Sequence, residues 1–339
     1  MSARQLTIAV VGATGAVGET LLTVLSEREF PIAKIYIVGS GDNPDDTAMF
    51  AERPVQVDAI ADFDFSRCQL VFFCAPAAVA KKYAPIAAKA GCWVIDTSSQ
   101  FRLDRKVPLV VPSVNGDVLA GLRAPQIIAS PAAHVVQAAT VLSPLQKKFG
   151  LSTVSVATML AVSALGKRGA NELAGQTARL LNAQPVKQQV FPSRIAFNLI
   201  PAFDAPHESG YTLEESEAAA EIKKLLKDEQ LETGISLVFA PVFYGHSQIL
   251  QVETKEPVTP AVARAPLKAE TSIKLARSSD NVVSAVDSSG GNDVVHIGRI
   301  AQPTGATRRL TLWSVADNMR KGAAVNIVEI AETLLKNHL

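Results

Sequence analysis

The sequence predicts an α/β protein in which a doubly wound parallel sheet is followed by a second domain of the α+β type. Short apolar runs alternate with helical stretches up to about residue 130, and longer, more alternating runs follow. A glycine-spaced turn joins the first strand to the first helix. The chain has 339 residues, of which 48% are hydrophobic. Because a domain holds roughly 150 residues, this length fits two buried cores.

The first part of the chain alternates strands and helices. Residues 6–25, LTIAVVGATGAVGETLLTVL, indicate a buried strand, a tight turn and a helix. Further buried strands are expected within 33–40, 69–76 and 92–99, and a helix is expected at 78–90. Short, continuously apolar strands are typical of a parallel sheet covered on both faces. Right-handed crossovers between them give a doubly wound sheet.

The pattern changes after about residue 130. Longer alternating strands are expected within 152–165, 236–254 and 311–315, and helices at 170–183 and 213–228. Such alternation indicates an antiparallel or mixed sheet with one wetter or partner-facing side.

The C-terminal segment 317–339 predicts one long amphipathic helix, with a Lys and a His near its end that complement the helix dipole. We therefore expect one domain at residues 1–130 with 317–339 and a second at 131–316. The sequence has no internal repeat and no low-complexity tract.

Charge and hydropathy argue against two classes of partner. Lys and Arg number 33 against 32 Asp and Glu, so nucleic acid is not an expected partner. The apolar run Leu70–Ala80 is shorter than the ~18 residues that a membrane span needs. The first eighteen residues have a basic residue and an apolar run, as a signal peptide does, but their continuation into a glycine turn and Glu19 favours a strand.

The cysteines indicate a reducing compartment. Cys68, Cys74 and Cys92 lack metal-ligand spacing, and an odd number argues against a disulfide scaffold. We expect a cytoplasmic protein without a metal site. We expect Cys74 and Cys92 to be small buried hydrophobic residues, the alternative being a displaced nucleophile.

The glycines of the segment GATGAVG directly follow a strand and open a helix, which is the context of a Rossmann-type dinucleotide site. Small residues let the backbone approach a pyrophosphate, and the helix N-terminus supplies unpaired N–H groups. The alternative is a turn that needs glycines only for packing of helix on strand. The expected cofactor contacts are Gly12, Thr14, Gly15, Ala16, Val17, Gly18, Ser40 and Asp42.

Five segments, in this order and over nearly the whole chain, resemble the aspartate-semialdehyde dehydrogenase family: GATGAVGETLLTVL, IDTSSQFRLDRKVPLVVPSVN, AFNLIPAFD, PVFYGHS and SVADNMRKGAAVNIVEIAE. The chain is most similar to the Usg-like members, which lack the active-site cysteine of the family. The resemblance implies an N-terminal NADP-binding Rossmann domain completed by the C-terminal helix. It also implies a central domain that forms the catalytic pocket and a homodimer interface.

The resemblance further implies a reaction in amino-acid biosynthesis, the reductive dephosphorylation of aspartyl phosphate to aspartate semialdehyde. In the family a cysteine thiolate carries the acyl group as a thioester. A histidine acts as acid and base, and arginines hold the substrate carboxylate and the phosphate.

The nucleophile segment departs from the family pattern, Pro-Asn-Cys-Ser/Thr followed two residues later by Gln. Pro131, Ala132, Ala133, His134 and Gln137 occupy these positions, so Ala133 stands in the place of the nucleophile. A methyl group forms no thioester, and loss of a nucleophile costs on the order of 10⁶ in rate. Ala132 replaces the asparagine that steadies the oxyanion, a donor worth ~3 kcal/mol.

The substrate positions depart as well. Phe239 stands where the family has an arginine, seven residues before His246, and a phenyl ring cannot grip a carboxylate as a guanidinium does. His246 is kept, as a vestigial acid/base or as a buried, hydrogen-bonded histidine. Glu214 opens the segment that corresponds to Glu-Glu-x-Lys of the family, and its lysine is replaced by Glu217. An acidic first helical turn is the ordinary alternative.

The loop after the second strand is acidic, whereas the family carries a basic residue there for the 2′-phosphate of NADP. Asp42, Asp45 and Asp46 repel such a phosphate, while a carboxylate can accept from a ribose 2′-OH, so NAD is favoured over NADP if either binds. A solvated acidic turn that binds neither cofactor is the alternative.

Other positions match the family. Arg102 corresponds to the phosphate-binding arginine, or forms an ion pair with a loop carboxylate, and Gln137 corresponds to the glutamine near the substrate carbonyl. Ser163 and Gly166 keep the outline of the helix entry.

We therefore expect a pseudoenzyme that has lost the thioester reaction and acts as a binding or partner protein for a small acidic metabolite. It would form a homodimer, or a mixed dimer with an active family member. The alternative is an NAD(P)-dependent oxidoreductase on a small acidic carbonyl compound, with His246 or His134 as proton donor. Rescue of the missing thiol by Ser130 or His134 is a weaker alternative, because a serine needs an adjacent base and an oxyanion hole.

Overall fold

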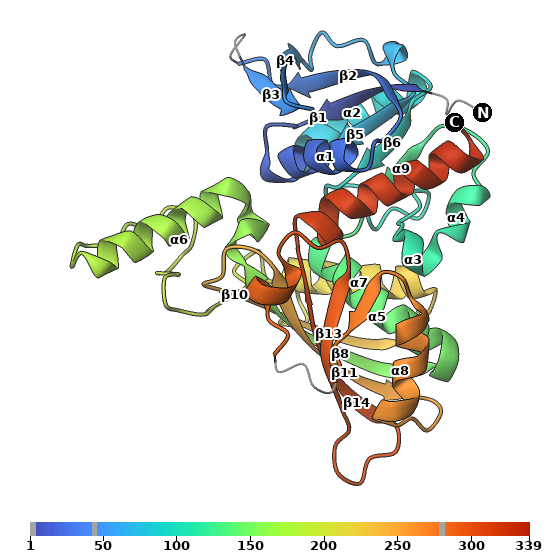
Figure 1. Ribbon diagram of the computed structural model, residues 1–339, viewed down its shortest axis with the longest axis vertical. Coiled ribbons are helices and arrows are strands. Elements are labelled where there is room, and N and C mark those ends of the chain that lie inside the picture. The colour runs from blue at the N-terminus through green and yellow to red at the C-terminus, as the bar shows by residue number, and fades with distance from the viewer. Residues whose placement is uncertain (1–4, 43–45, 278–281) are drawn as a thin grey trace. The chain divides into compact units, whose positions relative to one another are not determined.

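The computed structural model describes residues 5–42, 46–277 and 282–339 (Figure 1). The chain forms two compact units. The first runs up to Ala132 and includes Ala323–Leu339, and the second is Ala133–Gly322.

The first unit is built on a sheet with the strand order β3-β4-β2-β1-β5-β6-β7. Every neighbouring pair is parallel except β3 with β4. The strands are β1 (Leu6–Val11), β2 (Ile32–Gly39), β3 (Thr47–Phe50), β4 (Arg53–Ala59), β5 (Leu70–Phe73), β6 (Trp93–Asp96) and β7 (Ile127–Ala129). The chain moves outward from β1 to one edge and then crosses to β5, so the switch point lies between β1 and β5, where ligands of doubly wound sheets bind.

Helices cover both faces of this sheet. They are α1 (Ala16–Glu27), α2 (Ala77–Lys89), α3 (Pro112–Asn115), α4 (Asp117–Ala120) and the C-terminal α9 (Val325–Asn337). Residues of α1 and α9 share one core with Ile8, Val10 and Phe72, whereas α2 shares the other with Ala9 and Val71. The alternation along each strand therefore feeds two apolar layers, and the prediction of a doubly wound sheet covered on both faces is confirmed.

The C-terminal helix belongs to the core of the first unit (Figure 1). Asn326 donates from Nδ2 to the carbonyl oxygen of Val110 at 3.1 Å. The prediction of one helix over 317–339 is wrong at its start, because α9 begins at Val325 after a π-helical turn, Arg320–Ala324. Asp317 accepts from the N–H groups of Met319 and Arg320, which turns the chain before the helix.

The second unit contains a mixed sheet in the order β12-β13-β14-β11-β8-β10-β9. The strands are β8 (Leu151–Ala161), β9 (Ile200–Pro201), β10 (Glu232–Ala240), β11 (His246–Thr254), β12 (Ile273–Leu275), β13 (Val295–Ala301) and β14 (Arg309–Ala316). The helices are α5 (Ala133–Phe149), α6 (Gly166–Leu181), α7 (Leu213–Leu226) and α8 (Pro260–Ala269). Along β8, Val154, Val156 and Leu160 are buried, while Ser155 is exposed, as the alternating pattern predicted.

Several elements escape the sequence pattern for physical reasons. The hairpin of β3 and β4 is largely exposed, and polar residues interrupt β4, so it lacks the apolar run of a buried strand. Helix α5 has buried residues around its whole circumference. A helix that is apolar all round shows no amphipathic period, which is why residues 133–149 are not recognised as a helix from their pattern.

Gly12 is required by the fold at the switch point. Its φ is +80°, and a Cβ added there would lie 2.5 Å from the carbonyl oxygen of Cys74. Gly91 also has a positive φ, +93°, but a Cβ there would meet no atom within 4 Å. We expect Gly91→Ala to cost about 1–2 kcal/mol for the left-handed backbone alone. We expect Gly12→Ala to cost about 1–3 kcal/mol more, because β1 and β5 would have to move apart.

Equilibrium unfolding in urea, followed by circular dichroism, measures both losses. Equal losses for the two variants would contradict the close approach of the two strand ends at Gly12.

Candidate functional site

The glycine turn of the first unit has the geometry of a pyrophosphate site. After β1, the N–H of Gly15 donates to the carbonyl oxygen of Gly12 at 3.2 Å, and α1 begins at Ala16. A Cβ at Gly18 would overlap the backbone of Gly12 and Ala13, so this glycine lets the helix approach the strand. The side chains of Ala16 and Val17 are small or half-buried. The first N–H groups of a helix lack internal partners and can donate to an anion.

The loop after β2 lies at the same edge of the sheet. The N–H of Gly12 donates to the carbonyl oxygen of Val38 at 2.9 Å, which ties the turn to β2. Ser40 and Asp42 follow β2 and are exposed, as is Thr14 in the turn. The structure thus brings the expected cofactor residues together at the C-terminal ends of β1 and β2. Asp45 lies outside the described residues.

In the second unit, Ala133 is the first residue of α5. A Cβ added to Gly322 would lie 2.7 Å from the Cβ of Ala133, so the methyl group sits directly on the backbone of Gly322. Gln137, one turn further along α5, is buried and donates from Nε2 to the hydroxyl of Ser314 at 3.0 Å. The side chain at this helix start is therefore one carbon long, and its neighbour on the helix face is an amide fixed to the sheet.

Gln248 supports the helix start from β11. Its Nε2 donates to the carbonyl oxygen of His134 at 2.8 Å and to the hydroxyl of Thr158 at 3.1 Å. Both Gln137 and Gln248 are at most 1% exposed, and in the described part of the structure their Oε1 atoms have no hydrogen-bond partner. A buried amide oxygen without a partner is costly. These two oxygens therefore mark a polar spot beneath Ala133 and His134.

His246 lies on the same strand as Gln248 and is 2% exposed. Its Nδ1 accepts from the N–H of Ala161 at 3.1 Å, which places the proton of the neutral ring on Nε2. Burial, and then the neighbouring imidazole of His134, lower the pKa of His246 from 6.5 to about 3. The ring is therefore neutral near pH 7, and it is a weak base.

Phe239 is part of an aromatic cluster. Its ring centroid lies 5.3 Å from that of Phe191 and 5.4 Å from that of Phe203. The Phe239 side chain is 4% exposed. An apolar cluster of this kind offers no hydrogen-bond donor to a carboxylate.

The acidic start of α7 has the structure of an ordinary helix cap. Glu215 forms a capping box with Thr212 and accepts from the N–H of Leu237 on β10 at 2.8 Å. Glu214 is exposed, and its N–H donates to Asp204 at 2.8 Å. Glu217 lies one turn further along and is half-buried. Glu215 thus acts as an ordinary acidic residue of a first helical turn. Glu214 stays a proposed substrate residue.

Arg102 belongs to the first unit and is held by backbone carbonyls. Its Nη2 donates to Thr97 at 2.7 Å and its Nε to Ser130 at 3.2 Å. Ser130 is 1% exposed, and its hydroxyl accepts from Nδ2 of Asn326 at 2.9 Å. Arg102 therefore braces the segment that leads to Ala133.

Comparison with known proteins decides the family. Residues 7–122 match the model "Semialdehyde dehydrogenase, NAD binding domain", and residues 142–321 match "Semialdehyde dehydrogenase, dimerisation domain". The aspartate-semialdehyde dehydrogenase of Shewanella violacea is 40% identical over 335 residues, 99% of each chain. The chain belongs to the aspartate-semialdehyde dehydrogenase family. The resemblance inferred from the five sequence segments is confirmed.

The relatives include both dehydrogenases and a USG-1 protein homolog. A USG-1 protein homolog of Azotobacter vinelandii is 36% identical over 329 residues, 97% of each chain. The crystal structure of aspartate semialdehyde dehydrogenase II of Vibrio cholerae, complexed with ASA, has a TM-score of 0.96. It is 40% identical, and the match covers 99% of this chain and 100% of that one. Overall identity therefore does not separate Usg-like members from dehydrogenases, so individual positions must.

The described cysteines do not offer a substitute for the family thiolate. All three are free. Burial, followed by the effect of Asp96, raises the pKa of the Cys74 thiol to about 12. Burial also raises the pKa of Cys68 to about 12 and that of Cys92 to about 11. The reactive species of a cysteine is the thiolate, so these thiols are inert near neutral pH, as small buried residues are.

Two further findings concern the described residues. None of their helices is both long and apolar enough to cross a membrane. In the same part of the chain, no group of three or more His, Cys, Asp or Glu side chains is arranged to hold a metal ion.

Sequence reasoning missed several residues of the site. Asn318 accepts from the N–H of Gly245 at 2.8 Å and donates to Ser163 at 3.0 Å, which ties the loop before His246 to the entry of α6. Gly322 and Gln248 are the other two. The only available signal was position: Asn318 and Gly322 lie inside a family segment, and Gln248 directly follows one. Their contacts join residues 73 (Gly245 and Asn318) to 189 (Ala133 and Gly322) positions apart in the chain, so local patterns do not contain them.

The buried His246 makes stability depend on pH. Because its folded pKa is about 3 and its unfolded pKa about 6.5, the unfolded state binds more protons between these values. The stabilisation is fully present above pH 6.5 and is lost as the pH falls below it, by at most about 1.4 kcal/mol per pH unit. We expect His246→Asn, whose Oδ1 can still accept from Ala161, to show a shallower loss.

Urea unfolding between neutral pH and pH 4 gives the two slopes. His207→Asn, which alters an exposed histidine, serves as the control. Identical slopes for the wild type and His246→Asn would refute the neutral, buried state of His246.

Proposed function

We propose that this protein does not carry out the thioester reaction of its family and acts as a binding or partner protein on the same scaffold. The observation that carries the proposal is Ala133, which stands at the nucleophile position of the family pattern and begins α5. A methyl group has no lone pair with which to attack an aldehyde. It also cannot act as the leaving group when phosphate takes up the acyl group. Without the thioester, no residue carries the acyl group between hydride transfer to the cofactor and attack by phosphate.

Neighbouring positions support the proposal. Ala132 is buried and has only a methyl group where the family pattern has an asparagine. Phe239 packs against Phe191 and Phe203, so an arginine there would bury an unpaired charge in an aromatic cluster. The nucleophile, the oxyanion donor and the carboxylate clamp are thus all replaced by apolar side chains.

The remaining polar groups offer no evident rescue. The hydroxyl of Ser130 contacts the amide of Asn326, which is not a base. His246 is neutral, with a pKa of about 3, whereas an efficient general acid or base has a pKa near the working pH. We therefore do not favour a reductase that uses His246 as its proton donor.

The ligand of the first unit is proposed to be a dinucleotide, with NAD preferred to NADP. The glycine turn between β1 and α1 supports binding of a pyrophosphate. The exposed carboxylate of Asp42 follows β2 at the same edge, where it could accept from a ribose hydroxyl and would repel a 2′-phosphate. A small acidic metabolite held by Arg102 is the proposed ligand of the ancestral substrate region.

The second unit is proposed to form a dimer, either with a second copy of the chain or with an active relative. The match of residues 142–321 to a dimerisation domain supports this. Large apolar side chains are also exposed on this unit: Leu199, Phe203, Tyr211, Phe243 and Tyr244 are each 42% exposed or more. Exposed apolar side chains such as these can be buried by a partner. The cytoplasm remains the proposed compartment.

Steady-state kinetics tests the proposal. The purified wild-type protein is mixed with aspartate semialdehyde, inorganic phosphate and either NAD or NADP, and reduced cofactor is followed by absorbance. We expect a rate on the order of 10⁶-fold below that of an active relative measured beside it. Robust, phosphate-dependent turnover would overturn the proposal.

Restoring the sulfur alone should not restore the reaction. We expect Ala133→Cys to react with iodoacetamide faster than the three native thiols, because a helix N-terminus lowers a thiol pKa while burial raises theirs. Turnover should still remain at least about 10²-fold below an active relative, since the oxyanion donor is missing. Ala133→Ser is the control for steric effects at Gly322. Full activity of Ala133→Cys would show that Ala132 and Phe239 are compatible with catalysis.

Cofactor preference is measured by thermal shift. We expect NAD to raise the Tm at concentrations about tenfold lower than NADP, because Asp42 repels the additional phosphate. Asp42→Arg should reverse this order, while Lys148→Gln, on α5, should leave it unchanged. A preference for NADP in the wild type would contradict the role given to Asp42, and no shift with either cofactor would contradict dinucleotide binding.

A further inference from the structure

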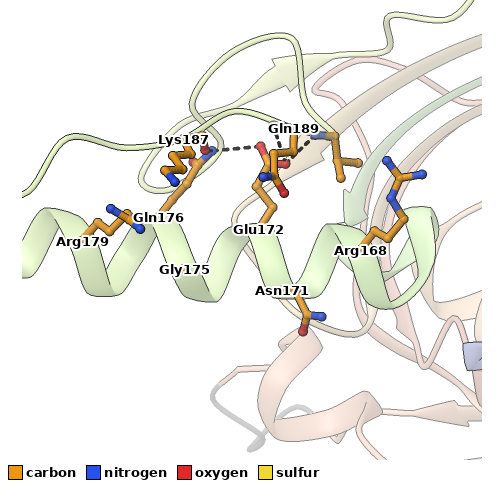
Figure 2. A pocket seen from close by; sticks show the side chains of 9 residues that line it. Arg168, Asn171, Glu172, Gly175, Gln176, Arg179, Lys187 and Gln189 are labelled. Carbon is orange, nitrogen blue, oxygen red and sulfur yellow. Dashed lines mark hydrogen bonds between the residues drawn. The ribbon is translucent and has the colours of Figure 1, made fainter.

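A pocket lies on α6 of the second unit, between the helix and the segment 187–190 (Figure 2). We call it the α6 pocket. Its cavity volume is about 400 Å³, within the range of small-molecule sites. None of the residues proposed above for cofactor or substrate binding lines it.

Buried polar side chains build the wall of the α6 pocket. Glu172 is 9% exposed, and its carboxylate accepts from the N–H groups of Gln189, at 3.0 Å, and Val190. Gln176, one turn further along α6, is 2% exposed and donates to the carbonyl oxygen of Lys187 at 3.0 Å and to Glu172 at 2.9 Å. These contacts fix segment 187–190 along the helix, so the pocket is formed before any ligand binds.

Gln176 also holds the chain beyond this segment. Its Oε1 accepts from the N–H groups of Ile195, at 2.9 Å, and Ala196, at 3.1 Å. Among the described residues that line the pocket, Glu172 supplies the one carboxylate, and its oxygens already accept from backbone N–H groups and an amide.

Gly175 forms an open part of the pocket in the middle of α6. A Cβ added there would meet no atom within 4 Å, and its φ is not in the positive range. A glycine inside a helix weakens the helix, and neither backbone conformation nor close packing requires one here. The absence of a side chain at Gly175 leaves free space on the pocket side of the helix.

Three cationic side chains surround this space. Arg168 and Arg179 are eleven positions apart, three helical turns, so they share one face of α6 about 16 Å apart along its axis. Figure 2 shows Arg179 and Lys187 near one end of the pocket and Arg168 near the other. Within the described part of the chain, none of the three side chains makes a hydrogen bond or an ion pair. The pocket thus has a positive charge at each end, and its three cationic side chains outnumber the one carboxylate, Glu172, among the described lining residues.

We propose that the α6 pocket binds a small organic polyanion with a negative group at each end, a phosphate ester or a polycarboxylate. Guanidinium groups hold either kind of anion by paired, charge-assisted hydrogen bonds. Arg179 and Lys187 bind one anionic group, Arg168 binds the other, and the side chain of Gln189 faces the middle of the ligand. This site does not depend on the state of the Ala133 position, so it stands or falls separately from the proposed loss of dehydrogenase activity.

Isothermal titration of the full-length protein tests the site with three probes: fructose 1,6-bisphosphate, citrate and inorganic phosphate. We expect saturable binding of at least one of the two larger anions at millimolar concentration, tighter than that of inorganic phosphate. The stronger of the two tells whether the natural ligand class is the phosphate ester or the polycarboxylate. No saturable binding of either larger anion would overturn the proposal.

Variants locate the binding. We expect the double variant Arg179→Gln, Lys187→Gln to weaken the affinity about tenfold or more, because charge-assisted contacts are lost. We expect a similar loss for Gly175→Leu, because its side chain fills the pocket. Gly175→Ala should raise the Tm and keep measurable binding, which separates filling of the pocket from damage to the helix. Lys148→Gln removes one positive charge outside the pocket and should leave the affinity unchanged.

Two results would refute the assignment even if a probe binds. Equal affinity in the wild type and in every pocket variant would place the anion elsewhere on the surface. Displacement of the probe by NAD would place it at the glycine turn of the first unit.

Discussion

The packing of the Ala133 methyl group on the backbone of Gly322, at the first residue of α5, sets what the second unit can do. A helix start is a good place for a thiolate, because its unpaired N–H groups stabilise negative charge. Here that position holds one carbon. The partners that remain, Gln137, Gln248 and a neutral His246, are fixed by hydrogen bonds to the sheet or to backbone. On the proposed function, these fixed polar groups are what remains of the site around Ala133.

The residues that hold the fold together differ in kind from those at the proposed site of the lost reaction. Gly12 and Gly18 keep the close approach of strand and helix, and Asn318 keeps the loop before His246 tied to the entry of α6. These residues hold the fold together. Ala133 and Phe239 stand at the positions that we propose to have lost the nucleophile and the carboxylate-binding arginine. With the first group intact and the second apolar, the scaffold can stay folded while the glycine turn and the α6 pocket are its proposed ligand sites.

Much of the fold could be predicted because buried strands are continuously apolar. Residues 6–11, 70–73 and 93–96 stand out for this reason, and the glycine turn marks the start of the first helix. Helix α5 could not be predicted, since burial on every side removes its amphipathic period. At the site, Ala133 and Phe239 were found from the family pattern, whereas Gln248 acts through contacts with residues about a hundred positions away. The α6 pocket depends on a turn whose path the sequence does not reveal.

The central claim, that no residue of this protein carries an acyl group, is tested most directly by intact-protein mass spectrometry. The protein is incubated with aspartate semialdehyde and oxidised cofactor without phosphate, so that an acyl intermediate, once formed, has no acceptor but water. An active relative treated in the same way provides the positive control. We predict the unmodified mass for this protein. A stoichiometric acyl adduct, mapped to any side chain by peptide analysis, would contradict the account.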